Sequence, residues 1–246
     1  DLKPINVANI GNSIKDIFIN AFGAFRIKPF RKIAIATFLI FNSFQVIAPF
    51  TFLIIVHYLF GSDTGAADYW PALHGSVGAI ITSFLVIPII TFMSNKIGKK
   101  KAFIISQLIS IIGYILFWFL FIPGKPYMFL FALPFHSFGI GSLFTIMMSM
   151  TADICDLDEL ENGNRREGVL GAVYWWMVKL GFGVAGLLSG LTLQFVGFDA
   201  DNVTEFAIDG MRIVYTLIHI WGILMDIYIM KDYDITEERA NEIKEK

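Results

Sequence analysis

Charged side chains are concentrated in one short stretch between two long apolar runs. Residues 153–168, with the sequence DICDLDELENGNRREG, hold six acidic and two basic residues. Asp153 and Asp156 are three positions apart, so they share one face of a helix, and the two arginines that follow can reach back to them. Exposed ion pairs contribute only about 0–1 kcal/mol each, so they form and break readily. The stretch, called the charged cluster below, therefore predicts a gating contact made by Asp153, Asp156, Arg165, Arg166 and Glu167.

A plainer role for these charges is to cap and solubilise the ends of helices. We favour that role for Asp158, Glu159 and Glu161. Carboxylates can also bind a divalent cation, but the stretch lacks the alternating ligand pattern of a calcium loop, and Arg165 and Arg166 would compete with the ion. We therefore predict no metal and no cofactor.

A second candidate is Lys179, a lone cation inside an apolar run. If that run spans a bilayer, the charge costs at least about 2.5–3.5 kcal/mol, so Lys179 is expected to face a watery cavity and to have a polar or acidic partner. Tyr174, Trp175 and Trp176 precede it by one to two helical turns, and aromatic rings stack on the apolar C–H faces of sugars. The alternatives are that Lys179 snorkels to an interface and that the rings only pack.

His136 lies in an earlier apolar run, between Pro134 and the pair Gly139 and Gly141. The proline and the glycines are expected to loosen the middle of this helix. An imidazole at this position is a polar contact to a ligand, a proton carrier, or a hydrogen-bonded structural histidine.

The elements that must position these residues are membrane helices. The chain is 56% hydrophobic with a mean hydropathy of +0.65, whereas a soluble domain is about 45–50% apolar. A spanning helix needs about 20 apolar residues, and the apolar runs lack the alternation of a membrane β-barrel. We predict an all-α membrane protein with six spans, at Ile33–Leu59, Ala72–Thr91, Ala102–Ile122, Tyr127–Met150, Leu170–Val196 and Ile213–Met230.

The distribution of Lys and Arg predicts the orientation of the spans, because these residues are enriched in cytoplasmic loops. Of the 19 basic residues, 16 fall on the side that holds both termini. Lys125 and Arg212 fall on the other side, and Lys179 lies within a span. Both termini are therefore expected in the cytoplasm. The positive charge lies along a membrane face, which gives no indication of nucleic-acid binding.

The predicted spans divide the chain into three regions. Residues 1–32 are expected to form a cytoplasmic linker, residues 33–230 a six-helix bundle, and residues 231–246 a cytoplasmic tail. The linker carries an apolar stripe at helical spacing that predicts an amphipathic helix ended by Pro29. The stripe consists of Ile10, Ile14, Ile17, Phe18, Ala21, Phe22 and Phe25.

Enzyme classes are not indicated. The sequence has no paired Cys or His metal spacing, no Gly-x-Ser-x-Gly turn, and no glycine-rich phosphate loop followed by lysine. Cys155 is the only cysteine, so a disulfide within the chain is excluded.

The order of residues in the charged cluster resembles the signature of a transporter family. These residues are Ala152, Asp153, Asp156, Asp158, Glu159, Leu160, Gly163, Arg165, Glu167 and Gly168. Their order and spacing are similar to those of the glycoside-pentoside-hexuronide cation symporters, the melibiose-permease type of the major facilitator superfamily. The lysine-rich loop Met93–Lys101 resembles the basic turn between the second and third helix of each half of such proteins.

The resemblance covers Ile33–Met230 and implies the C-terminal, six-helix half of a major facilitator superfamily transporter. It implies transport of a sugar or glycoside with Na+ or H+ by alternating access, with an N-terminal six-helix half as the partner that carries most of the cation site. It places Lys179 at the sugar cavity and Phe144 where melibiose permeases have a cavity tryptophan. It also implies a bacterial cytoplasmic (inner) membrane and contact with its lipids.

Two other functions fit the same residues. A lysolipid transporter of similar fold would use Lys179 as a headgroup contact and would need a cavity open to lipid. A non-transporting membrane sensor or scaffold would not depend on Lys179.

Overall fold

The computed structural model describes residues 19, 21–163 and 165–244, and within these residues the regular structure is helical, with no strand. Six helical segments of the described chain are long and apolar enough to cross a membrane. They are Lys28–Leu59, Thr64–Ile97, Lys99–Leu120, Pro126–Asn162, Glu167–Phe195 and Glu205–Met230. The predicted all-α membrane class is confirmed.

Several of these segments are composite. The first joins α2 (Lys28–Leu53) to the π-helical η2 (Ile54–Leu59). The second contains α3 (Thr64–Ala67), α4 (Trp70–Ile81), the π-helical η3 (Thr82–Val86) and α5 (Ile87–Ile97). The third is α6 (Lys99–Leu120). The fourth contains the 3-10 helix η4 (Pro126–Ala132), α7 (Leu133–Ser142), the π-helical η5 (Leu143–Met147) and α8 (Met148–Asn162). The last are α9 (Glu167–Phe195), α10 (Glu205–Met230) and the short α11 (Glu237–Lys244).

The helices extend beyond the predicted spans at their polar ends. The fourth span was expected to end at Met150, but α8 continues through Asn162, so most of the charged cluster is helical. Hydropathy detects only the apolar part of such a helix, whereas solvated charges let it continue into water. The helix ends where Gly163 adopts a left-handed conformation, with φ of 68°, which glycine adopts without strain.

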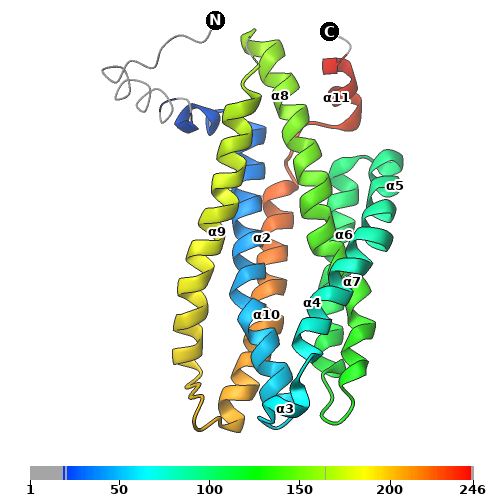
Figure 1. The fold of residues 1–246 in the computed structure, drawn as a ribbon. Coiled ribbons are helices and arrows are strands. Elements are labelled where there is room, and N and C mark those ends of the chain that lie inside the picture. The colour runs from blue at the N-terminus through cyan, green and yellow to red at the C-terminus, as the bar shows by residue number, and fades with distance from the viewer. Residues whose placement is uncertain (1–18, 20, 164, 245–246) are drawn as a thin grey trace, which may run out of the picture.

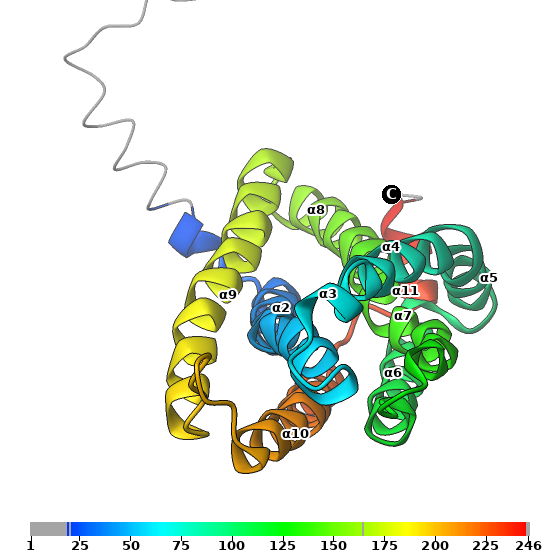
Figure 2. The same cartoon turned by 60° about the horizontal axis from the view of Figure 1, so that its bottom comes forward.

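Helix α2 lies at the centre of the bundle, with α9 and α10 packed along it (Figure 2). On the other side α6 packs closely on α7. The start of α2, the joint between α8 and α9, and α11 all lie at one end of the bundle, whereas α3 lies at the opposite end (Figure 1). In the orientation predicted from Lys and Arg, the first end is the cytoplasmic one. The two ends are called cytoplasmic and outer below, as labels taken from this prediction.

Two apolar clusters fill the bundle. One joins the cytoplasmic halves of the helices and includes Phe30, Phe103 and Met147, and α11 adds Ala240 and Ile243 to it. The other lies in the outer halves and is rich in aromatic rings. The most apolar stretches of the second and fifth spans are only 11% and 28% buried. These two helices therefore keep broad faces that the described chain does not cover.

The predicted amphipathic helix of the linker lies mostly outside the described residues, including Ile10, Ile14, Ile17 and Phe18. In the described part, Phe25 packs against the inner apolar cluster, whereas Phe22 is 71% exposed. Pro29 is in the first turn of α2, where its missing N–H is not needed.

The contact between α6 and α7 depends on glycine at position 113. A Cβ atom there would lie 2.4 Å from the backbone nitrogen of His136. We expect Gly113→Ala to destabilise the protein by about 1–3 kcal/mol, the usual cost of overpacking, measured by thermal unfolding in detergent. Gly75→Ala is the matched control, because a Cβ at Gly75 meets nothing within 4 Å. Equal stabilities of the two variants would contradict this packing.

Candidate functional site

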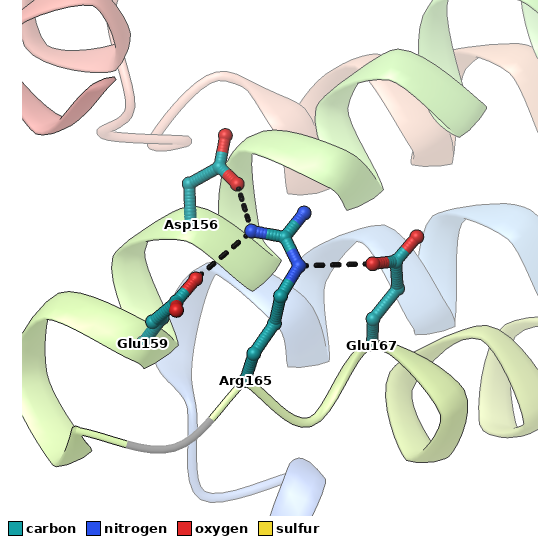
Figure 3. Close-up of polar contacts among 4 residues, drawn as sticks. All are labelled: Asp156, Glu159, Arg165 and Glu167. Atoms are coloured by element: carbon teal, nitrogen blue, oxygen red, sulfur yellow. Dashed lines mark hydrogen bonds and ion pairs between the residues drawn. The ribbon is translucent and has the colours of Figure 1, made fainter.

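The charged cluster is organised around Arg165, which contacts three carboxylates (Figure 3). Its Nη1 donates to Asp156 Oδ1 and to Glu159 Oε2, each at 2.9 Å, and its Nε donates to Glu167 Oε2 at 2.9 Å. The carboxylates of Glu167, Glu159 and Asp156 raise the pKa of the guanidinium above its ordinary value. The side chain of Arg165 is nevertheless 44% exposed, so these contacts remain open to water and to exchange.

Arg166 makes a different and more protected contact. It donates to both carboxylate oxygens of Asp158, through Nε at 2.7 Å and through Nη2. The Asp158 side chain is 0% exposed, and Asn162 Nδ2 donates to its Oδ1 at 2.8 Å. Hydrogen bonding to Asp158 raises the pKa of Arg166. The sequence assigned Asp158 to helix-end solvation, but its burial with Arg166 makes it a structural anchor between α8 and the start of α9.

Asp153 faces another helix. Its Oδ2 accepts from Lys99 Nζ, at the start of α6, at 2.5 Å, and the Asp153 side chain is only 4% exposed. The neighbouring Lys100 donates to the backbone oxygens of Lys231 and Tyr233, which follow α10. Burial raises the pKa of the Tyr233 phenol, and the nearby carboxylates of Asp153 and Asp234 raise it further.

The cytoplasmic charges thus join neighbouring helices of this chain. Asp156 meets Arg165, as its spacing suggests, whereas Asp153 meets Lys99 rather than either arginine. The sequence could not have indicated the second pair, because Lys99 is 54 residues away. The exposed part of the network is the group around Arg165.

The predicted substrate residues divide into two groups on α9. Lys179, Trp175 and Trp176 are exposed on the broad uncovered face of this helix, with the two indoles 44% and 57% exposed. Tyr174 is 1% exposed and packs within the bundle, where its ring meets that of Trp175 edge-on at 5.7 Å. Among the described residues, none of the ion pairs includes Lys179.

Phe144 lies at the same depth in the bundle as this part of α9. Its ring meets Phe41 of α2 edge-on at 5.5 Å, and Phe41 in turn meets Phe182 of α9 at 5.6 Å. Beside them, Asn42 Nδ2 donates to the backbone oxygen of Gly181 at 3.2 Å. Phe144 is 44% exposed, and it lies within the π-helical η5, a type of segment that is frequent at functional sites.

His136 is placed elsewhere, in the outer half of the bundle. It stacks on Phe44 at 5.7 Å and lies 6.1 Å from the ring of His74 and 5.2 Å from that of Tyr114. Sequence reasoning assigned no role to His74, because nothing in the sequence shows that α4, α6 and α7 bring these rings together.

Residues 20–237 match the family described as MFS/sugar transport protein. The chain belongs to this family. It is a membrane transporter family and not an enzyme family, and the match agrees with the symporter signature of the charged cluster.

The relatives carry related names. The chain is 28% identical to a glucuronide carrier protein homolog of Escherichia coli (strain K12), over 74% of this chain and 39% of the relative. It is 25% identical to an uncharacterized symporter of Bacillus subtilis (strain 168), over 69% and 36%, and 24% identical to an isoprimeverose transporter of Lactiplantibacillus pentosus, over 59% and 31%. The aligned part thus spans less than two fifths of each of these relatives.

Removing a carboxylate partner of Arg166 should cost more stability than removing one of the partners of Arg165. We expect Asp158→Ala to cost about 1–3 kcal/mol, less than the about 3–5 kcal/mol of a fully buried pair, because the Arg166 side chain is 31% exposed. Glu159→Ala should cost at most about 1 kcal/mol, because Arg165 keeps two other carboxylates. Thermal unfolding of the two variants in the same detergent measures the difference, and equal losses would show that the Arg166 pair is not an anchor.

Proposed function

We propose that this chain is the C-terminal six-helix half of a secondary transporter that carries a sugar or glycoside together with Na+ or H+ by alternating access. The family match and the names of the relatives support transport of a sugar-like molecule. In this proposal both termini are cytoplasmic, and the transporter lies in the bacterial cytoplasmic membrane. The N-terminal half packs on the uncovered faces of the second and fifth spans.

The observation that carries the proposal is the position of Lys179. Its ammonium lies on an exposed face of a spanning helix, beside two exposed indoles and near the level of Phe144. A charge at this depth is stable only beside water, a partner or a ligand. A sugar-binding cavity between the two halves supplies such surroundings. In it Lys179 binds hydroxyl or carboxylate oxygens of the ligand, and a tryptophan ring stacks on the sugar.

The charged cluster serves as the inner gate in this proposal. The group around Arg165 is its movable part, because its contacts are exposed and each is individually weak. The buried Asp158–Arg166 pair holds α8 and α9 together, so the two helices move as one unit. Opening and closing then exchange the carboxylate partners of Arg165 for groups on the other half.

The lysolipid alternative has one observation in its favour. An apolar groove of about 580 Å³ lies between the outer ends of α9 and α10, lined by Leu188, Leu191, Phe195, Val214 and Ile218 among others. Its lining suits an acyl chain. However, the groove lies two to four turns from Lys179 along α9. A lysolipid would therefore have to extend from its headgroup at Lys179 to its acyl chain in the groove.

The full-length transporter tests the role of Lys179. We expect Lys179→Ala to abolish uptake of a labelled sugar or glucuronide into cells, because the mutant loses the charged contact to the ligand. Lys125→Ala, which removes an exposed outer lysine, is the control and should transport normally. Normal uptake by Lys179→Ala would refute the site, and uptake of labelled lysolipid in place of sugars would favour the alternative.

The isolated chain provides a separate test of the half-transporter proposal. Reconstituted alone in vesicles, residues 1–246 should show no uptake of sugar driven by a Na+ or H+ gradient. The same vesicles with the full-length transporter are the positive control. Ion-driven uptake by the isolated chain would refute the proposal.

A further inference from the structure

A pocket of about 320 Å³ lies in the outer half of the bundle, between α2, α4, α6, α7 and α10. His74 and Gly75 of α4, His136 of α7 and Tyr114 of α6 line it, together with Phe44 of α2. Gly75 is exposed, and a Cβ atom there would meet nothing within 4 Å. The pocket therefore opens beside Gly75, on the poorly covered face of α4.

Helix α2 gives the depth of this pocket relative to Lys179. Phe41 and Asn42 lie at the level of Phe182 and Gly181, within one turn of Lys179. The pocket begins at Phe44 and continues outward along α2 to positions 47, 48, 51 and 52. At 1.5 Å per residue, these positions are roughly 4–17 Å outward of Phe41. The pocket is thus the next space along α2 from the predicted sugar site.

Three polar atoms of the lining are buried without a hydrogen-bond partner: His74 Nε2, His136 Nδ1 and the Tyr114 hydroxyl. Tyr114 is 0% exposed, and a buried polar group without a partner loses the hydrogen bonds that it makes to water in the unfolded chain. Behind Tyr114, the ring of His219 stacks on it at 3.8 Å, and the Nδ1 of His219 also has no partner. So many unsatisfied groups within one membrane protein core indicate a site that hydrogen-bonds a polar ligand.

The rest of the lining restricts the ligand to a largely apolar ring. The lining contains no Asp, Glu, Lys or Arg, and most of its surface comes from aromatic and aliphatic side chains. A sugar, with a hydroxyl on nearly every carbon, would need more donors and acceptors than two imidazoles, the tyrosines and Thr51 supply. An aromatic ring with one or two polar atoms matches both the stacking surface of Phe44 and the few polar groups.

We propose that this pocket, the outer pocket, binds the aglycone of a glycoside whose sugar ring lies at Lys179. The inference rests on the proposed function, and it adds His74, Tyr114 and Gly75 to the residues that select the ligand. The polar sugar meets the charged residue and the tryptophans, and the apolar aglycone meets the outer pocket. Selection for glycosides over free sugars then arises in this half of the transporter.

Chemical modification tests the outer pocket without relying on transport. Purified full-length transporter is treated with diethyl pyrocarbonate, and carbethoxylation of each histidine is followed by mass spectrometry. Phenyl β-D-glucuronide and phenyl β-D-glucoside are compared with free glucuronate and glucose. We expect one of the phenyl glycosides to slow modification of His74 and His136 by about tenfold, an occupancy effect of about 1.4 kcal/mol, whereas the free sugars have little effect.

His57 is the internal control for this experiment. It lies at the outer end of η2 with its Nδ1 2.8 Å from Ser62 Oγ, outside the lining of the pocket. Its modification should not respond to any of the four compounds. Phenol alone at the same concentration should also give no protection, because the sugar supplies part of the binding energy.

Gly75→Leu provides the matched variant. A Cβ atom at position 75 meets nothing within 4 Å, so the fold should persist with the melting temperature of Gly75→Ala, while the leucine side chain, at the lining of the outer pocket, takes up space that the ligand needs. In Gly75→Leu the phenyl glycosides should no longer protect His74 and His136, whereas Gly75→Ala should keep the protection. In transport assays Gly75→Leu should weaken competition by the phenyl glycoside about tenfold and leave competition by the free sugar unchanged.

Several outcomes would overturn the inference. These are equal protection by phenyl glycosides and free sugars, protection by phenol alone, protection retained in a folded Gly75→Leu variant, or no protection at all in the wild type. Failure of the proposed function looks different. In that case the full-length protein takes up no sugar, or the Lys179→Ala variant takes it up normally. Either result is independent of the histidine modification.

Discussion

The exclusion of charge from hydrocarbon is the constraint on which the rest of this structure depends. Most basic residues of the described chain lie toward one end of the bundle, where some of them meet the carboxylates of α8 and the backbone that follows α10. Because these contacts lie at the polar end of the bundle, they can include exposed groups such as Arg165. Lys179 instead lies within a span, on an uncovered face of α9, where a charge is stable beside water, a partner or a ligand, or when it snorkels to an interface.

Close approach of helices is the second requirement, and small residues provide it. In a membrane, helices gain little from the hydrophobic effect between them, so packing and polar contacts hold them together. Gly113 and Gly139 bring α6 against α7, with Ser110 and the backbone of His136 filling the space that side chains would need. This tight pair forms the back wall of the outer pocket.

The sequence was sufficient to predict the spans, the helical class and the charged cluster, because hydropathy and local spacing decide these features. It could not predict the pairing of Lys99 with Asp153 or the contact of His74 with His136, because each joins residues from different helices. The burial of Asp158 also escaped prediction, since it depends on the turn at Gly163 that returns Arg166 to α8. The predicted stripe of the linker remains a prediction, because most of it lies outside the described residues.

The π-helical segment η5 has a mechanical consequence. It holds Phe144 and connects α7, which lines the outer pocket, to α8, which carries the charged cluster. A π-turn accommodates one more residue than an α-turn, and one residue corresponds to about 100° of rotation in an α-helix of 3.6 residues per turn. Conversion of η5 to α-helix would therefore rotate α8 about its own axis relative to α7. The outer pocket and the carboxylates around Arg165 would then be linked by a screw-like motion of one continuous helix.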